Sequence, residues 1–155
     1  MSRSLHGTRR RIAVRRSSIH GRGVFALAAI PKGSRLIEYI GERISHDEAD
    51  RRYGEEHGDS PHTMLFAVDD ETVIDATYQG NSSRWINHCC APNCEAVNDE
   101  GRIFIEAIRG IRPDEEITYD YNLILDERHT PALKRANPCF CGSQHCRRTL
   151  LGSKR

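Results

Sequence analysis

The sequence predicts one mostly β or α+β domain, and three observations lead to this class. The chain has 155 residues, which is one domain's worth and enough for a single hydrophobic core. Its apolar residues gather in many short runs that turn-forming residues separate. Strand and helix patterns do not alternate along the chain, so a parallel α/β fold is not expected.

The first half of the chain combines short strands with one helix. The expected strands are residues 12–14, 24–26 and 35–39. Residues 17–23 and 31–33 are turn-rich and separate these strands. Residues 47–56 are polar and favour a helix, which the Gly and Pro within residues 58–61 end.

The second half adds strands and a cysteine-rich end. A hairpin is expected where two apolar runs flank Asp69 and Asp70. Residues 81–87 favour a short helix or a turn, and residues 123–138 a loop with a little helix potential. The expected strands here are residues 65–68, 72–74, 101–108 and 117–119.

Charge is segregated along the chain, although the net charge is only +1. Residues 1–37 carry nine Lys or Arg and no acid, residues 38–127 all 22 acids against seven bases, and residues 128–155 seven bases and no acid. An acidic body with a basic arm at residues 1–11 favours a Lys/Arg-rich protein partner by electrostatic steering. The alternative is an ordinary solvated acidic face with two basic ends.

Composition also indicates where the protein acts. No apolar run approaches the ~20 residues of a membrane span, and no signal peptide is recognisable, so we expect an intracellular protein. Arg outnumbers Lys by 20 to 3, which favours a GC-rich, bacterial genome. The cytoplasm or nucleoid is then the expected location, with host chromatin or a nucleus as the alternative.

The six cysteines favour a metal site over disulfides. Cys139, Cys141 and Cys146 place three thiolates within eight residues, and Gly142 allows a tight turn between them. Zn²⁺ takes four ligands in a tetrahedron, so one distant cysteine is needed to complete the site. The candidates for that ligand are Cys89, Cys90 and Cys94. Free, buried thiols are the alternative.

Four ordered segments carry the chemical signals. Residues 20–25 read His-Gly-Arg-Gly-Val-Phe, and residues 84–94 read Arg-Trp-Ile-Asn-His-Cys-Cys-Ala-Pro-Asn-Cys. Residues 116–121 read Glu-Ile-Thr-Tyr-Asp-Tyr, and residues 139–146 hold the cysteine-rich tail. Together they resemble the SET-domain protein lysine methyltransferases over residues 12–151.

The resemblance implies a SET fold, with small, mostly antiparallel sheets, a pseudoknot and a zinc-stapled C-terminal post-SET tail. In the pseudoknot, the Asn-His segment and the Tyr-containing strand cross beneath one another. The implied parts are a basic flexible arm (1–11), the SET domain (12–122), a connecting loop (123–137) and the post-SET zinc segment (138–155).

The resemblance also implies S-adenosyl-L-methionine as cofactor and one structural Zn²⁺. The cofactor would bind on one face, and the substrate lysine would enter from the opposite face. The cofactor-binding positions carried over are His20, Gly21, Arg22, Gly23, Met64, Asn87, His88 and Phe140. The zinc ligands carried over are Cys90, Cys139, Cys141 and Cys146. Cys94 is then a small buried residue.

The implied catalytic residues are Tyr121, Tyr119 and Tyr39. Tyr121 matches the catalytic tyrosine, and we expect it to orient the reacting groups, because a phenol with a pKa near 10 is a poor base. Tyr39 would line the lysine channel. Tyr119 stands where the family has Phe or Tyr, and Tyr there favours mono- and dimethyl-lysine.

The implied activity is protein-lysine N-methylation of a basic protein, such as a histone tail or a nucleoid protein. Cys89 replaces the family's usual Ser, and Met64 a cofactor-contacting Tyr of many members. These departures keep open a catalytically weak SET domain that serves as a binding module. Another alternative is a zinc-stapled nucleic-acid binder whose basic arm contacts phosphates non-specifically.

Overall fold

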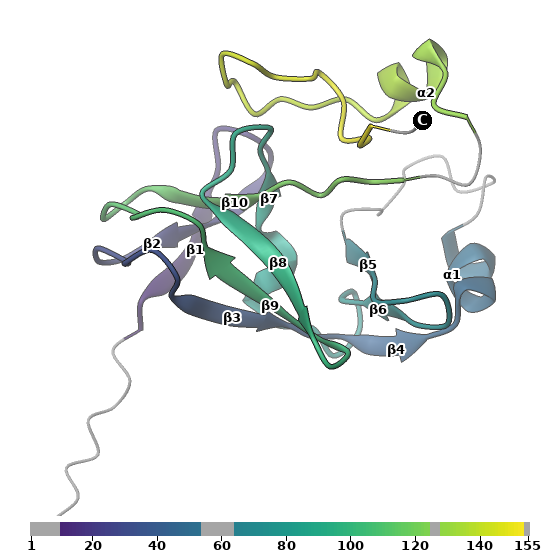
Figure 1. Cartoon of the computed structure of the whole chain (residues 1–155), viewed down its shortest axis with the longest axis horizontal. Helices are drawn as coiled ribbons and strands as arrows, with labels where there is room; N and C mark the ends of the chain where they lie inside the picture. The colour runs from purple at the N-terminus through teal and green to yellow at the C-terminus, as the bar shows by residue number, and fades with distance from the viewer. Residues whose placement is uncertain (1–9, 54–63, 125–127, 154–155) are drawn as a thin grey trace, which may run out of the picture.

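The computed structural model describes residues 10–53, 64–124 and 128–153, and its strands form two sheets (Figure 1). In the larger sheet the strands run in the order β1-β2-β10-β8-β9-β3, and β7 pairs with β10. The smaller sheet has the order β4-β6-β5. The predicted mostly β class is therefore confirmed.

The strands are short, as the sequence predicts. Those of the larger sheet are β1 (Ile12–Arg16), β2 (Arg22–Ala26), β3 (Arg35–Tyr39), β7 (Asn87–His88), β8 (Cys94–Asp99), β9 (Arg102–Ala107) and β10 (Glu116–Tyr119). Those of the smaller sheet are β4 (Glu42–Ile44), β5 (Leu65–Ala67) and β6 (Val73–Asp75). The helical segments described are α1 (His46–Tyr53), the 3₁₀ turn η2 (Ser82–Trp85) and α2 (Pro131–Ala136). No helix in these ranges is long and apolar enough to span a membrane.

Every predicted strand is present, with ends within two residues of the expected ones. The predicted hairpin joins β5 and β6 in antiparallel register. The sequence reasoning missed β4, β7 and β8. The first two are too short to show alternation, and β8 contains Asn and Asp, which are depleted in strands. The expected helix at 47–56 starts at His46, but residues 54–63 and 1–9 lie outside the described ranges.

Strand β10 is the centre of the larger sheet. It pairs antiparallel with β2, and parallel with both β7 and β8. The buried Asn93 side chain extends this pairing, because its amide donates to the Glu116 carbonyl (2.7 Å) and its oxygen accepts from the Thr118 N–H (2.9 Å). The Asn-His segment and the Tyr-containing strand therefore lie side by side.

Two apolar clusters hold the sheets together. The larger cluster is built on fully buried side chains that include Val24, Ile105 and Ile117, each with no exposed surface. The smaller cluster consists of Tyr39, Ile74, Ala76 and Ile103. Phe66 and Ala96 pack against both, so burial of apolar surface joins the two sheets directly.

Helix α1 is fixed to the smaller sheet by a buried carboxylate. Asp75 has no exposed surface and accepts hydrogen bonds from Tyr53 (2.7 Å) and Arg52 (3.1 Å). Arg52 also pairs with Glu42 and Glu48. Burial alone would raise the pKa of Asp75, but these hydrogen bonds hold that pKa below its usual value. The carboxylate thus stays charged and holds α1 beside β6.

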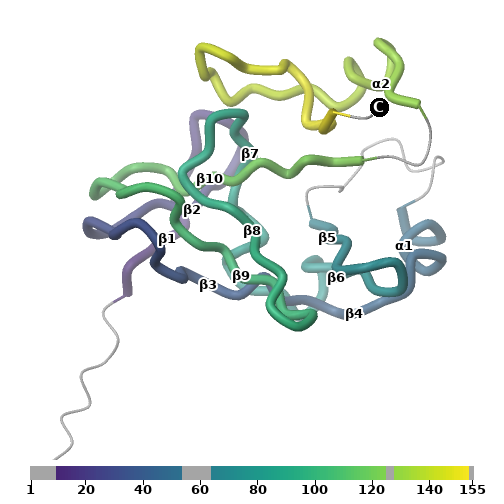
Figure 2. The backbone as a smooth tube through the Cα atoms, in the orientation of Figure 1, coloured from purple at the N-terminus to yellow at the C-terminus, as the bar shows by residue number. Residues whose placement is uncertain are grey.

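The C-terminal tail returns to the larger sheet (Figure 2). Leu123 and Leu151 form a parallel bridge, and Pro138 and Thr149 an antiparallel one. The Gly152 N–H donates to the Leu123 carbonyl at 2.8 Å. The segment that follows β10 is therefore held from one side by the tail.

Candidate functional site

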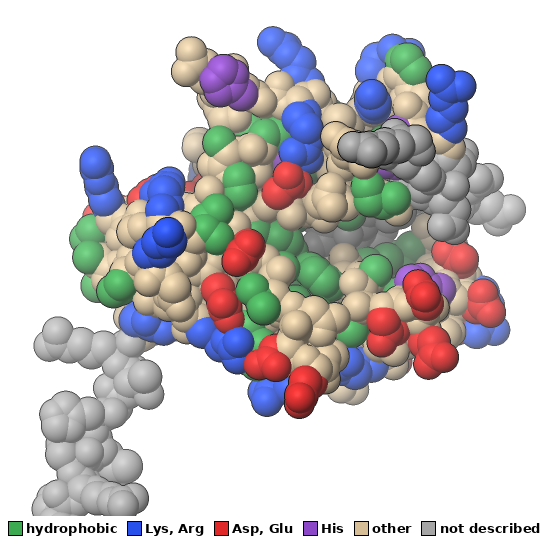
Figure 3. Space-filling view, in the orientation of Figure 1, with side chains coloured by type: hydrophobic (Ala, Val, Ile, Leu, Met, Phe, Trp, Pro, Cys, Tyr) green, Lys and Arg blue, Asp and Glu red, His purple; other side chains and the backbone are tan. Residues whose placement is uncertain are grey.

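A cleft of about 810 Å³ lies between α1 and β5 on one side and β8 and the end of β10 on the other. Figure 3 shows hydrophobic side chains within the hollow and acidic ones on the face beneath it. The aromatic residues of its lining are Tyr53, Phe66, Tyr119 and Tyr121. The segment formed by residues 120–124 also lines it. The cleft is thus both aromatic and adjacent to the tail.

The three predicted catalytic tyrosines, Tyr39, Tyr119 and Tyr121, form a row of neighbouring aromatic rings together with Phe66. They differ in how far they are buried. The rings of Tyr119 and Tyr121 are 4.9 Å apart, and both residues line the cleft. Phe66 lies 6.5 Å from Tyr119 and 5.4 Å from Tyr39. Tyr39 is 1% exposed and lies behind Phe66, outside the cleft lining. Its hydroxyl has no hydrogen-bond partner among the described residues.

Tyr121 is held at both ends. Its hydroxyl donates to the Ile86 carbonyl, and its backbone N–H donates to Nδ1 of His88 at 3.0 Å. Burial raises the pKa of Tyr121 well above the ordinary phenol value. The hydroxyl therefore stays protonated at neutral pH, and its oxygen lone pairs remain free to accept a hydrogen bond from a group in the cleft.

The Gly-containing loop between β1 and β2 is tied to β7 by one side chain. The Asn87 amide donates to the carbonyls of His20 (3.1 Å) and Arg22 (2.9 Å), and to the Glu116 carboxylate (2.9 Å). Gly21 has a φ of 43°, a left-handed conformation that glycine adopts without strain. His20, Gly21 and Arg22 are exposed, whereas Gly23 is buried. The loop is thus held in a fixed position, with His20, Gly21 and Arg22 at the surface.

His88 connects Tyr121 to Cys90. Nδ1 accepts the Tyr121 N–H, so the ring proton of the neutral form lies on Nε2, which is 3.3 Å from the Cys90 sulfur. Burial lowers the pKa of His88 to about 4, which keeps the ring neutral. The resemblance assigns His88 to the cofactor site, but in the structure both ring nitrogens face protein atoms.

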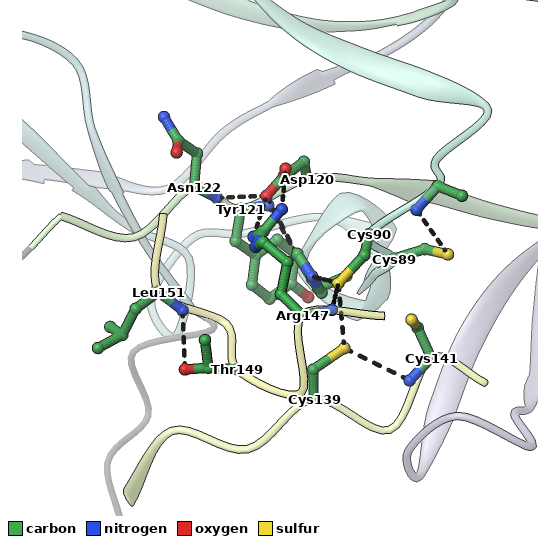
Figure 4. Close-up of polar contacts among 12 residues, drawn as sticks. Cys89, Cys90, Asp120, Tyr121, Asn122, Cys139, Cys141, Arg147, Thr149 and Leu151 are labelled. Atoms are coloured by element: carbon green, nitrogen blue, oxygen red, sulfur yellow. Dashed lines mark hydrogen bonds and ion pairs between the residues drawn. The ribbon is translucent and has the colours of Figure 1, made fainter. Parts of the chain in front are cut away.

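Four cysteines converge between β7 and the tail. Figure 4 shows Cys90, Cys139 and Cys141 of this cluster, with Cys89 beside them. The sulfurs of Cys90, Cys139, Cys141 and Cys146 all lie within 4.8 Å of one another. Cys90 is 3.8 Å from Cys139 and 4.0 Å from Cys146. A tetrahedron with Zn–S bonds of ~2.3 Å has edges of about 3.8 Å, so the four thiolates fit a zinc ion. Four soft sulfur ligands favour Zn²⁺ over oxygen-preferring cations.

The structure distinguishes the three cysteines that spacing alone left equivalent. Cys90 joins the cluster, while the Cys89 sulfur accepts a hydrogen bond from the Ala91 N–H at 3.4 Å. Cys94 is 1% exposed and packs in the larger apolar cluster at the start of β8.

Comparison of the sequence with known proteins identifies its family. A SET-domain family model covers residues 21–122 of the chain. The chain belongs to the SET-domain family. It is 44% identical to histone-lysine N-methyltransferase set1 of Dictyostelium discoideum over 154 residues, or 95% of this chain. It is 42% identical to histone-lysine N-methyltransferase SETD1A of Homo sapiens over 142 residues (87% of this chain), and 40% identical to histone-lysine N-methyltransferase trithorax of Drosophila melanogaster over 145 residues (90%). The chain spans 10%, 8% and 4% of these relatives, respectively.

Other positions carried over to this SET domain lie at the edges of the site. Phe140 stands between two clustered cysteines and is 65% exposed. Met64 precedes β5, and its carbonyl accepts the Ala76 N–H at 2.8 Å. Trp85 lies 5.3 Å from the Arg22 guanidinium and 4.7 Å from that of Arg84.

Sequence reasoning missed several residues that organise the SET site. Asn93 completes the β10 ladder, and the Ile86 carbonyl orients Tyr121. Asp120, which directly follows β10, and Arg147 of the tail form a two-pronged ion pair. The one available signal was position, since Asp120 directly precedes Tyr121 and Arg147 directly follows Cys146.

Removing one clustered sulfur is expected to abolish metal binding. In Cys139→Ser, three thiolates remain, and we expect zinc content to fall from about one per chain to nearly none. Elemental analysis after dialysis against a weak chelator measures this. Cys89→Ser is the matched control, because Cys89 lies beside the cluster but outside it, and should keep its zinc. Equal zinc loss in both variants would contradict the assignment.

Proposed function

We propose that this SET domain is an S-adenosyl-L-methionine-dependent protein-lysine N-methyltransferase that acts on histones. The observation that carries the proposal is the placement of Tyr121, which lines an aromatic cleft beside Tyr119 and whose hydroxyl is held by the Ile86 carbonyl. The names of the relatives support it, since set1, SETD1A and trithorax are all histone-lysine N-methyltransferases. Relatives from Mycosarcoma maydis and Saccharomyces cerevisiae carry the description H3 lysine-4 specific.

The charge of the cleft supports a basic substrate. Asp50 on α1 and Glu95 on β8 both line it, and both are exposed. Neither carboxylate forms an ion pair with any described residue. Two unpaired carboxylates attract a cationic peptide and fix its orientation more than they add affinity. A lysine-rich histone tail, with the H3 tail as the first candidate, has the required charge.

The cleft also suits the proton chemistry of lysine. A free lysine side chain has a pKa near 10.4, so about 10⁻³ to 10⁻⁴ of it is neutral at pH 7, a cost of ~4–5 kcal/mol. Burial of the ammonium among Tyr119, Tyr121 and Phe66 lowers that pKa. The Tyr121 hydroxyl donates to Ile86, so its oxygen can accept an N–H of the amine and orient the nitrogen lone pair.

The residues present fit the proposed cofactor. The exposed loop at residues 20–22 offers amide contacts, and the exposed ring of Phe140 an aromatic one. The Nε of Arg84, which is buried and has no hydrogen-bond partner among the described residues, offers a cationic contact. Arg84 would hold the cofactor's carboxylate, and His20, Gly21, Arg22 and Gly23 its remaining polar groups through the backbone. Asn87 would act by fixing this loop, Met64 and Phe140 by packing, and His88 by holding Tyr121. The bound cofactor supplies an electrophilic methyl group.

Zinc is the proposed occupant of the four-cysteine cluster, in a structural role. All four positions are taken by thiolates, and structural zinc sites are closed in this way, whereas catalytic ones keep an open position. Histone substrates place the activity on chromatin.

Loss of the Tyr121 hydroxyl is expected to remove catalysis while cofactor binding persists. Tyr121→Phe keeps the ring and the backbone bond to His88 but removes the oxygen that orients the amine, so kcat should fall roughly 100-fold or more. Mass spectrometry of an H3-tail peptide incubated with S-adenosyl-L-methionine measures the 14 Da additions. Calorimetry measures cofactor affinity, which should stay unchanged. A variant with near-native kcat would refute this role.

Tyr119 is expected to limit the number of methyl groups added. Its hydroxyl occupies space beside Tyr121, so the wild-type chain should yield mainly mono- and dimethyl-lysine. Tyr119→Phe should shift the product toward trimethyl-lysine without lowering total turnover. Peptide mass spectrometry at completion separates the three states. Dominant trimethylation by the wild-type chain would contradict the prediction.

A further inference from the structure

We propose that Asp120 and Arg147 are a positioning pair, which holds the C-terminal tail against the segment that follows β10 and contains Tyr121. By holding the tail there, the pair sets the affinity of the site for cofactor and peptide. The inference rests on the proposed function. It adds two residues that act through the tail and touch neither the reacting amine nor the methyl group.

Asp120 and Arg147 form an ion pair with two parallel hydrogen bonds. The two terminal nitrogens of Arg147 meet the two oxygens of Asp120 at 2.7 and 3.0 Å. Such two-pronged contacts between charged groups fix orientation as well as distance. Both side chains are about one-third exposed, so solvent screens the pair only in part. Figure 4 shows Arg147 reaching from the tail to Asp120, next to Tyr121.

The pair closes a ring of contacts that includes one cysteine of the cluster, Cys90. The Arg147 backbone N–H donates to the Cys90 sulfur at 3.3 Å, while its side chain holds Asp120. Nδ1 of His88 lies 3.5 Å from Asp120, and its Nε2 lies 3.3 Å from Cys90. Arg147 is therefore the one residue of this ring that belongs to the tail. It contacts both Cys90 of the cluster and Asp120, the residue that follows β10.

Two surfaces depend on where the tail lies. On one side, Phe140 is exposed beside the cysteines and is available to the cofactor. On the other side, residues 120–124 line the cleft, and the tail holds them through the Leu123–Leu151 bridge. Asp120 is the first residue of this wall, so a tail released at Arg147 loosens both the cofactor face and the peptide face.

Tyr121 does not depend on the pair. Its hydroxyl bond to Ile86 and its backbone bond to His88 remain when Arg147 is truncated. The pair should therefore affect binding and leave the chemical step intact. This pattern is the reverse of that expected for Tyr121→Phe, in which kcat falls and cofactor binding persists.

The test compares Arg147→Ala with Arg148→Ala in the full, zinc-loaded chain. Arg148 is the matched control, because it is the next residue, is exposed, and makes no side-chain ion pair among the described residues. In Arg147→Ala, the cofactor Kd and the peptide KM should each rise about tenfold, with kcat within about twofold of wild type and the zinc content unchanged. Arg148→Ala should match wild type. Arg147→Lys, which restores the charge without the fork, should recover part of the loss.

Asp120→Asn completes a double-mutant cycle. It removes the charge but keeps the oxygen that accepts the Asn122 N–H at 2.8 Å. If the two residues act only through each other, the double variant should be no worse than either single variant. Multiplicative effects, or an Arg147→Ala variant indistinguishable from Arg148→Ala, would overturn the proposal. So would a lowered kcat with unchanged KM, the result of simple loss of folded protein.

A separate readout keeps this inference distinct from the proposed function. If the wild-type chain transfers no methyl groups, the proposed function fails, and amide hydrogen exchange still tests the pair. Residues 122–124 and 139–152 should exchange faster in Arg147→Ala than in Arg148→Ala, while Tyr121, β1 and β2 stay unchanged. Equal exchange in both variants would overturn the pair's role regardless of activity.

Discussion

The sulfur of Cys90 is the contact on which the arrangement of the site depends. It belongs to the segment that runs parallel to β10, yet it lies within 4.8 Å of three sulfurs from the tail. Through His88 it also connects to the backbone of Tyr121. One metal ion bound there would therefore fix three things together: the tail, the strand β7, and the residue expected to orient the substrate. Four thiolates so close together repel one another unless a cation neutralises them, so a metal ion bound there would stabilise the docked tail.

The cleft shows how burial serves chemistry in this fold. The phenol of Tyr121 is kept protonated because its surroundings cannot stabilise the charged form, and the same surroundings would favour a neutral lysine. The cleft's rim is acidic through Asp50 and Glu95, which suits a cationic peptide before its lysine is buried. The carboxylates that would attract the peptide thus lie apart from the aromatic side chains that would favour the neutral form of its lysine. The buried Asp75 binds Arg52 and Tyr53 of α1, and it thereby fixes the helix that carries Asp50.

Local patterns were enough to predict seven of the ten described strands, the hairpin across Asp69 and Asp70, and the class of fold. The ordered motifs also singled out Tyr121, Asn87 and the cysteines, because their chemistry is concentrated in a few contiguous segments. What could not be predicted were contacts between distant segments. Asp120 and Arg147 lie 27 residues apart, and their positions beside Tyr121 and Cys146 do not indicate that they pair with each other. Cys90 could not be chosen over Cys89 and Cys94 from the residues alone for the same reason. Which of these side chains points toward the tail depends on the course of the folded backbone.

The most direct test of this account is amide hydrogen exchange of the zinc-loaded chain before and after chelation. If the cluster holds the tail against β10, removal of the metal should increase exchange in residues 139–152 and at Tyr121 and Leu123, while β1 and β2 keep their protection. Exchange at Tyr121 and Leu123 that does not change on chelation would contradict the account, because the metal would then hold the tail alone. Uniform loss of protection in every strand would also contradict it, since the metal would then support the whole fold and not the site.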